Sequence, residues 1–214
     1  MTDTIAQDDT RERLLQAAGQ EFARVGFERA SVRDICSAAG ANISAIKYHF
    51  GGKEALYMAV WEVASGHMQG SEPMPTLQDG DDPEVVLRAF IAWFMRLVIV
   101  DGQKREWTGR LLSHEMLEPT PAAFRPFVER CCRRVRDELL RLVKAISRDA
   151  LGPRRLDHIV YALIAMCTSY KHYERLYHDL GYEVPAKTPG VNSLAAIVGD
   201  LAIGGIRSFR VEDE

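Results

Sequence analysis

Helical periodicity constrains the fold of this chain more than any other feature. Apolar side chains recur at intervals of three and four residues along nearly the whole sequence, and no segment alternates convincingly between apolar and polar residues as a strand does. The first stripe ends near Gly26, which can stop a helix; its members are Leu14, Leu15, Ala18, Phe22 and Val25. The sequence therefore predicts an all-α chain of about nine helices.

The positions of proline and glycine predict the bounds of the remaining helices. Proline is tolerated at a helix start because the first N–H groups have no intrahelical partner, and Pro83, Pro121 and Pro153 occupy such places. Gly152 and Gly181 follow predicted helix ends. The expected ranges are 31–39, 43–49, 53–67, 83–100, 104–117, 121–149, 153–180 and 191–208.

Composition favours a soluble protein of the reducing cytoplasm. The 214 residues are 47% hydrophobic, which is enough to bury a sizeable core. No window approaches eighteen uninterrupted apolar residues, and the polar start MTDTIAQDDT is unlike a signal peptide, so we expect no membrane attachment. The cysteines form no CxxC pair, which agrees with a reducing compartment; they are Cys36, Cys131, Cys132 and Cys167.

Charge is unevenly distributed along the chain. The whole sequence has a net charge of −3, yet residues 11–53 hold seven Lys/Arg against four Asp/Glu. A basic N-terminal pole on an acidic body suits a protein that binds DNA with one end only. The clearest exposed connection beyond that pole is GSEPMPTLQDGDDP, residues 70–83, which is rich in glycine, proline and acidic residues and has no helical period.

Two short capped helices meet in the segment SVRDICSAAGANISAIKYHF, residues 31–50. Ser31 followed three residues later by Asp34 resembles a capping box that opens the first helix. Gly40 can adopt the left-handed conformation that ends it, and Asn42 can cap the next helix. Two helices joined by a three-residue turn that contains glycine form a helix–turn–helix pattern.

The second helix of this pattern exposes a short polar face. With Ile46 at the buried centre, a rotation of about 100° per residue puts Ile43 on the buried side and Ser44 and Tyr48 nearly opposite. A major groove admits such a helix, and hydroxyl, ammonium and phenol groups can donate to base edges or phosphates. The predicted DNA-binding residues are Arg33, Ser44, Ala45, Lys47, Tyr48, His49 and Lys53.

Glycines after the second helix suggest an additional phosphate contact. Gly51 and Gly52 would leave backbone N–H groups open to a phosphate at the start of the next helix, beside Lys53. A capped helix pair with a polar outer face also occurs in proteins that bind no DNA. A helical enzyme or small-molecule-binding protein that retains the helix–turn–helix fold is therefore the alternative.

The run RERLLQAAGQEFARVGFERASVRDICSAAGANISAIKYHFGGKEALY resembles the N-terminal domain of the TetR family of bacterial transcriptional regulators. The matching parts are LLQAAGQEFARVGF, SVRDICSAAG and the run from Ile46 that contains YHF and KE. The chain departs from that pattern at Lys47, where the family usually has tyrosine, and at Ser44, where it often has glycine or alanine. The run AAGANISAIKYHFGGKEALY and the helix FVERCCRRVRDELL are similar to the subgroup typified by the regulator CecR.

The resemblance implies a homodimer that binds a palindromic DNA operator as a repressor and lets go when a small-molecule effector enters its C-terminal domain. Residues 1–52 would form the DNA-binding domain, and residues 53–214 the effector-binding and dimerisation domain. We expect no catalytic residue, metal site or cofactor, since the chance motif Ser44-Ala-Ile-Lys47 lacks companion motifs and His114-Glu115 lacks the second histidine of a zinc motif.

The C-terminal part offers two sets of large apolar residues. A suitable cavity lining for the effector is Trp93, Phe94, Trp107, His114, Phe127, Tyr170 and Tyr173. The candidates for the dimer interface are Leu163, Cys167, Tyr170, Leu194, Ile197, Val198 and Leu201. Aromatic residues at helical spacing also describe a plain core, and the last two long helices could both be central core helices.

Overall fold

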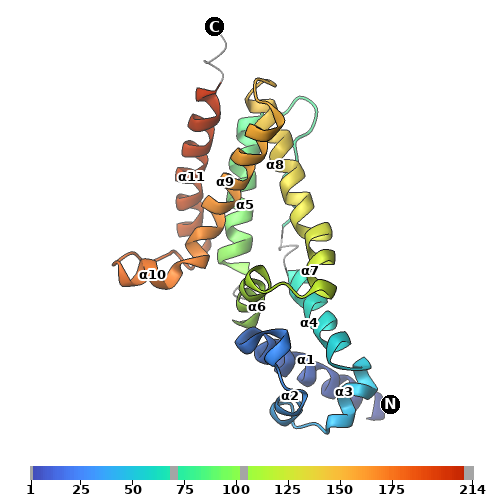
Figure 1. The fold of residues 1–214 in the computed structure, drawn as a ribbon. Helices are drawn as coiled ribbons and strands as arrows, with labels where there is room; N and C mark the ends of the chain where they lie inside the picture. The colour runs from blue at the N-terminus through green and yellow to red at the C-terminus, as the bar shows by residue number, and fades with distance from the viewer. Residues whose placement is uncertain (1, 68–71, 102–105, 210–214) are drawn as a thin grey trace. The chain divides into compact units, whose positions relative to one another are not determined.

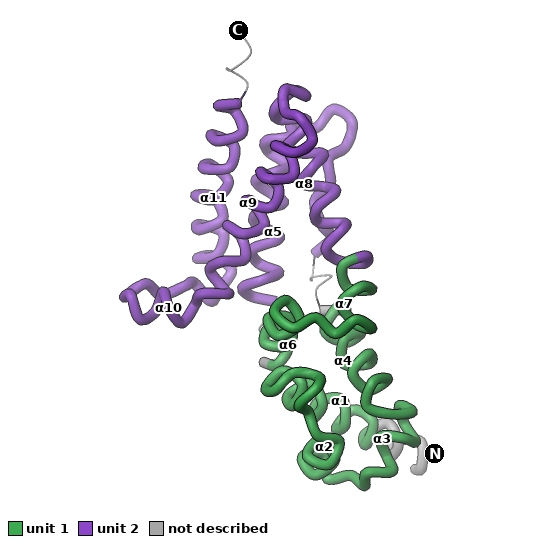
Figure 2. The backbone as a smooth tube through the Cα atoms, viewed as in Figure 1, with its two compact units in different colours: residues 1–67, 102–128 green, residues 68–101, 129–214 purple. Residues whose placement is uncertain are grey.

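A computed structural model of the chain describes residues 2–67, 72–101 and 106–209 (Figure 1). The described residues are mainly helical and contain no strand, which confirms the all-α prediction. The chain divides into two compact units, coloured separately in Figure 2. Unit 1 comprises residues 1–67 and 102–128, and unit 2 comprises residues 68–101 and 129–214. The predicted domain boundary at residues 52 and 53 falls within unit 1, and as a functional boundary it stays a prediction.

Unit 1 is built around the first helix. Its helices are α1 (Thr2–Arg29), α2 (Val32–Ala38), α3 (Ile43–Phe50), α4 (Lys53–His67), α6 (Glu106–Leu117) and α7 (Pro121–Phe127). The observed bounds of α2, α3 and α4 agree with the predicted ranges to within a residue. Phe22 on α1 packs edge-on against Tyr57 on α4, with ring centroids 4.7 Å apart, and both side chains are buried. The unit thus has an aromatic core of its own.

Two glycines of α1 have conformations or surroundings that a larger residue would not accept. Gly26 has φ 77° and ψ 171°, so the helical backbone is broken there as the sequence predicts. Gly19 lies against the indole of Trp107 on α6, and a Cβ at this position would sit 2.5 Å from the ring. Gly19 therefore allows α1 and α6 to pack closely.

Unit 2 is a bundle of long helices with one short helix beside it. Its helices are α5 (Pro83–Ile99), α8 (Arg133–Ile146), α9 (Pro153–His172), α10 (Glu174–Asp179) and α11 (Thr188–Ser208). Buried aliphatic and aromatic side chains from α5, α8, α9 and α11 form one continuous core. The irregular segment before α5 is fixed to α8, because the buried Glu138 carboxylate accepts from the backbone N–H of Leu77 at 2.6 Å.

Two predicted helices are interrupted in the structure. The range 121–149 contains a π-helical segment, Val128–Cys132, between α7 and α8. Pro126 shortly precedes it and cannot donate to the carbonyl one turn back, which disturbs the regular hydrogen-bond pattern. The range 153–180 breaks at Tyr173, whose φ of −106° and ψ of 20° are not helical. The prediction of one continuous helix was wrong in both ranges.

Helix α11 is a long and largely apolar helix of unit 2. Among the helices in the described ranges, it is the one whose length and composition would allow it to cross a membrane. It packs along α5, and Val191, Leu194 and Val198 are buried within the unit. Its apolar composition thus supplies one side of a protein core.

Candidate nucleic-acid interface

The first helix of the motif begins and ends with the predicted capping interactions. Ser31 Oγ accepts a hydrogen bond from the backbone N–H of Asp34 at 3.3 Å. Gly40 has φ 61°, and the backbone N–H of Ala41 donates to the carbonyl of Cys36 at 2.9 Å. These interactions satisfy backbone groups that a short helix leaves open at its two ends. They fix the length of α2 and the direction in which the chain leaves it.

The cap of α3 also fixes a residue of its outer face. Asn42 Oδ1 accepts from the backbone N–H of Ser44 at 3.1 Å, and the Ser44 hydroxyl donates to the same oxygen at 3.2 Å. Ile46 is buried with Ile35 and Cys36 of α2. Because one side of α3 is held by this packing, the opposite side has a defined orientation toward solvent.

Three cations stabilise the motif from within unit 1. The Arg13 guanidinium donates to the carbonyl of Ala39 at the end of α2 at 3.1 Å. The Arg11 guanidinium lies 5.3 Å from the centre of the Phe50 ring. Lys53 Nζ donates to the carbonyl of Glu28 at 3.2 Å and lies 4.7 Å from the centre of the Phe27 ring. The predicted Lys53 thus connects α4 to the end of α1, and its contact with DNA stays a prediction.

Part of this structural role could not be read from the sequence. The cationic side chains of residues 11 and 13 contribute to the basic pole, but their contacts lie more than 25 residues away along the chain. Helical spacing predicts neighbours three and four residues apart and carries no signal for such tertiary contacts.

The outer face of α3 lies open to solvent. Tyr48 is 72% exposed, and its ring packs edge-on against His49 at 4.9 Å between centroids. Ser44 and Lys47 are exposed, and so is Arg33 on α2. Ala45 and His49 are half-buried at the edges of this face. The structure therefore brings six of the seven predicted DNA-binding residues onto α2 and α3, and it places the seventh at the start of α4.

Two expectations about this region were wrong. Ile43 was expected on the buried side, yet it is 55% exposed. As the first residue of α3 its side chain points back past the start of the helix, where the seven-residue α2 provides little cover. Gly51 was expected to offer a free N–H to phosphate, but that N–H donates to the carbonyl of Lys47 at 3.0 Å and closes α3.

Phenol, hydroxyl, ammonium and guanidinium groups give this surface a strong donor character. Such groups bind phosphate oxygens and the acceptors on base edges in the major groove. Ile43 adds an apolar side chain that is suited to contact a thymine methyl group. Elsewhere on the basic pole Arg24 is paired with Glu21 at 2.8 Å, which reduces its share of the positive field. We define the reading face as Arg33, Ile43, Ser44, Lys47 and Tyr48.

Comparison with known families accounts for both parts of the chain. The family model described as bacterial regulatory proteins, tetR family, matches residues 14–60. The model described as the C-terminal domain of the HTH-type transcriptional dual regulator CecR matches residues 83–206, which is more than half of the chain. The chain belongs to the TetR family and is CecR-like. The first match includes the complete helix–turn–helix and the reading face.

Individual relatives agree with this assignment. The chain is 27% identical over 178 residues to the dual regulator CecR of Shigella flexneri, an alignment that covers 81% of the chain and 65% of that relative. It is 35% identical over 86 residues to the transcriptional repressor NicS of Pseudomonas putida, with 40% of each chain covered. The matched regions thus span less than two thirds of these relatives' own lengths.

Solved structures share the fold. A TetR-like transcriptional regulator from Rhodococcus sp. RHA1 has a TM-score of 0.62 at 20% identity, with 92% of this chain and 94% of that chain covered. The TetR family regulator PfmR from Thermus thermophilus has a TM-score of 0.58 at 17% identity, with 90% and 97% covered. At these identities the likeness concerns the fold.

The predicted effector residues are distributed over the two units. Trp107, His114 and Phe127 belong to unit 1, where the Trp107 indole N–H donates to Gln16 Oε1 at 3.1 Å and the Phe127 ring lies 5.1 Å from that of Trp61. The other four belong to unit 2: Trp93 and Phe94 are buried, Tyr170 is half-buried and Tyr173 is exposed. Each unit therefore uses its own subset in its packing, and an effector role for these residues stays a prediction.

A small cavity lies beside one predicted effector residue. It has a volume of about 90 Å³ and is lined by Glu72, Trp93, Arg96, Val100, Asp101 and Thr188. Drug-sized ligands occupy pockets of roughly 300 Å³ or more, so this cavity is too small for one in the present conformation. Within the described ranges, the His, Cys, Asp and Glu side chains form no group of three or more that could hold a metal ion.

The predicted dimer residues differ in what they face. Leu163, Cys167, Leu194 and Val198 are buried in the core of unit 2, and Tyr170 is half-buried. These side chains are already occupied within the chain and offer a second chain little surface. Ile197 and Leu201 on α11 are exposed, and Tyr161 on α9, which the sequence did not single out, is exposed as well. The α9–α11 face is defined here as these three side chains with the small residues around them.

Proposed function

We propose that this TetR-family regulator binds a palindromic operator as a homodimer in the cytoplasm, represses the adjacent genes, and releases the DNA when a small molecule binds. The observation that carries the proposal is the reading face of α3. Its core side is fixed by Ile46 and its cap by Asn42, while Lys47 and Tyr48 project into solvent. A rigid helix that presents donors in this way matches the requirements of a major groove.

The small size of the reading face supports the homodimer part of the proposal. An eight-residue helix makes few base contacts, and a pair related by a two-fold axis doubles them on a palindromic site. The α9–α11 face supports this part of the proposal, because Tyr161, Ile197 and Leu201 are exposed and Gly204 and Gly205 have open space beside them. Exposed apolar side chains beside glycines allow helices of two chains to approach closely.

A buried polar network links α4 to α6 and α7 within unit 1. Tyr57 on α4 donates its hydroxyl to Glu115 at 2.9 Å, and Glu115 also accepts from the backbone N–H of Thr120 at 2.8 Å. Burial, together with the neighbouring carboxylate, raises the pKa of Tyr57 to about 12, so the phenol retains the proton that it donates. Since α4 directly follows the reading helix, a change in this network would reach the DNA-binding surface.

An unpaired donor near this network supports an effector contact. Trp61 Nε1 on α4 is buried and makes no hydrogen bond of normal geometry with the described residues, although its N–H group lowers the pKa of the neighbouring Tyr57 hydroxyl. An unsatisfied buried donor costs about 1–3 kcal/mol, which a ligand acceptor would recover. The effector, on this proposal, binds next to Trp61 and Phe127 and competes with the packing that holds α4 against α7.

Titration of DNA from upstream of the protein's own gene tests the proposal. We expect saturation at two chains per site in fluorescence anisotropy, and an affinity that falls steeply with salt because phosphates supply much of the attraction. A scrambled fragment of equal length is the control. Equal affinity for both fragments, or saturation at one chain per site, would favour the alternative of a binding protein that retains the fold.

A further inference from the structure

The segment between α9 and α11 exposes apolar side chains beside the bundle of unit 2. We define the arm as residues 173–182, which include α10. None of the six residues of α10, all of which are described, is buried. Leu176 is 54% exposed and Leu180 is 73% exposed, and Tyr173 and Tyr182 are exposed as well. Figures 1 and 2 show α10 extending sideways from the ends of α9 and α11.

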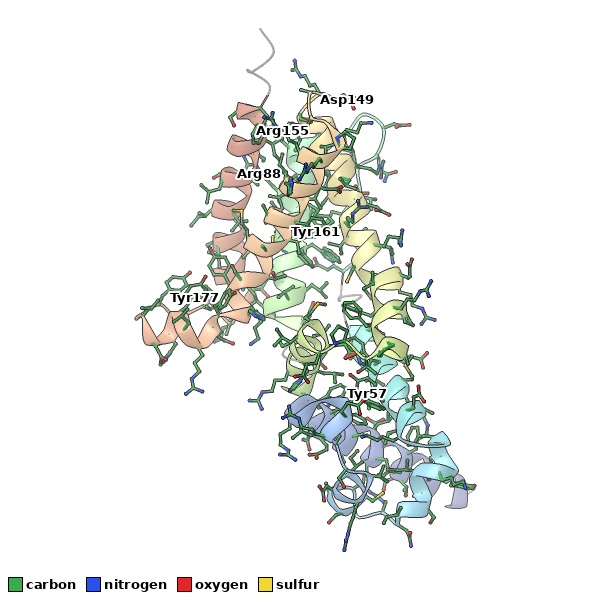
Figure 3. All side chains as sticks on the ribbon, in the orientation of Figure 1. Tyr57, Arg88, Asp149, Arg155, Tyr161 and Tyr177 are labelled. Carbon is green, nitrogen blue, oxygen red and sulfur yellow. The ribbon has the colours of Figure 1, made fainter. Side chains whose placement is uncertain are left out.

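One side of the arm is fixed to the rest of unit 2. The ring of Tyr177, labelled in Figure 3, lies 5.9 Å from that of Tyr170 on α9 and 6.1 Å from that of Tyr182. Lys171 Nζ donates to Glu174 Oε2 at 2.6 Å and adds an ionic contact at the junction. These contacts place the arm and leave Leu176 and Leu180, one helical turn apart, uncovered by the chain itself.

The exposed leucines are costly for an isolated helix of this length. A helix of six residues has little stability of its own in water, and exposed leucine side chains add nothing to it. The polar residues Arg175, His178 and Asp179 are exposed beside the leucines. An apolar centre with a polar margin is the usual composition of a protein–protein interface.

The arm belongs to a larger concentration of exposed apolar side chains. Among the described residues, seven of the twelve large hydrophobic side chains that are exposed lie on α9, the arm or α11. The α9–α11 face contributes three of them, and the arm contributes four. A stable interface buries roughly 800 Å² per partner, supplied by about 20 residues on each side. Three large side chains among small residues are few for that purpose, and the arm more than doubles their number.

We propose that the arm docks on a second copy of this chain, next to the α9–α11 face, so that the partner buries Leu176 and Leu180 of each protomer. The inference rests on the proposed homodimer and assigns it a second contact besides the helix pairing. A second copy fits because the arm and the α9–α11 face lie on the same unit. A two-fold axis would then form the arm contact twice in each dimer.

Sedimentation equilibrium of the full chain tests the arm contact. The variant is L176D/L180D, and the control is L117D, because Leu117 is also 73% exposed but lies on α6 of unit 1. We expect the double variant to raise the dimer dissociation constant by roughly 100-fold or more, since four leucines per dimer lose their burial. The control should change it less than about threefold.

The results separate failure of this inference from failure of the proposed function. If the wild type sediments as a monomer at every concentration, the homodimer and the arm contact both fail. If the wild type is a dimer and L176D/L180D dimerises equally well, the arm contact is overturned and the homodimer stands. Hydrogen exchange on the wild type gives an independent readout. Amides of residues 174–181 should exchange at least about tenfold more slowly in the dimer than in the diluted monomer, and equal rates would overturn the proposal.

Discussion

Helices α3 and α11 are both amphipathic, but they expose opposite kinds of surface. In α3, eight residues long, Ile46 is buried and the solvent side carries hydroxyl, amine and phenol groups. In α11, 21 residues long, eight residues are buried and the solvent side still carries Ile197 and Leu201. Both helices have a buried face, so the hydrophobic period describes them equally well.

The difference lies in the chemistry of the exposed residues. Polar donors on a short, capped helix suit a polar, charged partner such as DNA. Exposed aliphatic side chains on a long helix gain most by contact with another protein surface. We therefore propose DNA reading for α3 and chain pairing for α11, and variants of each helix test this division.

The largest effect is expected from charge on the apolar exposed side of α11. In I197D/L201D, the dimer dissociation constant should rise by roughly 1000-fold, because four carboxylates would be buried or forced apart at the pairing surface. Circular dichroism should be unchanged, since both side chains are exposed within the chain. Analytical ultracentrifugation measures the first quantity. An unchanged dimer dissociation constant would show that α11 is not part of the pairing surface.

The next effect concerns the exposed side of α3. K47A/Y48A should weaken operator binding by roughly 100-fold or more, because each half-site loses one cation and one contact to bases. The dimer dissociation constant should stay within about twofold of the wild-type value, because the two side chains are distant in sequence from the pairing helices. Anisotropy and ultracentrifugation on the same preparation check both values. An unchanged operator affinity would contradict the role of this face.

Cys167 tests which side of α9 faces inward. The sequence placed it at the dimer interface, whereas burial in the core raises the pKa of its thiol from 9 to about 12. The folded pKa exceeds the unfolded one, so the thiol's contribution to stability is complete below pH 9 and is lost as pH rises toward 12.

Urea denaturation at pH 8 and pH 10.5 measures this loss. The free energy of unfolding of the wild type should fall by about 2 kcal/mol more than that of C167A between these two pH values. The reason is that roughly 1.5 pH units separate pH 10.5 from the pKa of the Cys167 thiol in the unfolded chain. I197D/L201D should show the same change in unfolding free energy between the two pH values as the wild type, since Cys167 is covered by its own chain. If the pH-dependent loss of unfolding free energy differed between the wild type and I197D/L201D, Cys167 would lie at the dimer interface.

Removing the caps of α2 and α3 separates stability from DNA reading. N42A and S31A should each lower the free energy of unfolding by about 1 kcal/mol, because each removes one side-chain acceptor at a helix start. Only N42A should also weaken operator binding, by roughly fivefold, since Asn42 Oδ1 holds the Ser44 hydroxyl. Chemical denaturation and anisotropy give the two values. Equal operator affinities in the two variants would show that the Asn42 cap of α3 does not contribute to DNA binding.

The smallest effect is on the salt dependence of binding. R33A should reduce the slope of log affinity against log salt by about 2, since each of the two protomers loses one phosphate contact. R24A is the matched control, because Arg24 is paired with Glu21 in the structure. Titrations at several salt concentrations measure both slopes, and an equal reduction in the two variants would show that Arg33 contributes general charge only.

Local chemistry explains which features the sequence could predict. Capping residues and glycines act on backbone groups within four residues, so the bounds of α2 and α3 followed from Ser31, Gly40 and Asn42. The break at Tyr173 carries neither glycine nor proline, and the ring of Tyr173 packs edge-on against that of His172 there. The bond between Tyr57 and Glu115 joins residues 58 positions apart, which no local pattern specifies.

The pairing surface shows a second limit of sequence patterns. Leu163 and Tyr161 are close in sequence and both apolar, yet the first is buried in the core and the second is exposed. A helix with apolar residues on two sides has one side for its own core and one for a partner, and a period of 3.6 residues does not distinguish them. The stripe through Leu163 and Cys167 was therefore assigned to the dimer although it forms the core of unit 2.

Selection of bound sequences from a random DNA library tests whether α3 reads bases in a dimer. If the exposed side of α3 reads bases in a dimer, the wild type will enrich two inverted half-sites whose centres lie about 10 base pairs, or a multiple of that, apart. K47A/Y48A will enrich a weaker or different half-site at the same spacing. Absence of an inverted pattern, or an identical half-site in the wild type and K47A/Y48A, would contradict the account.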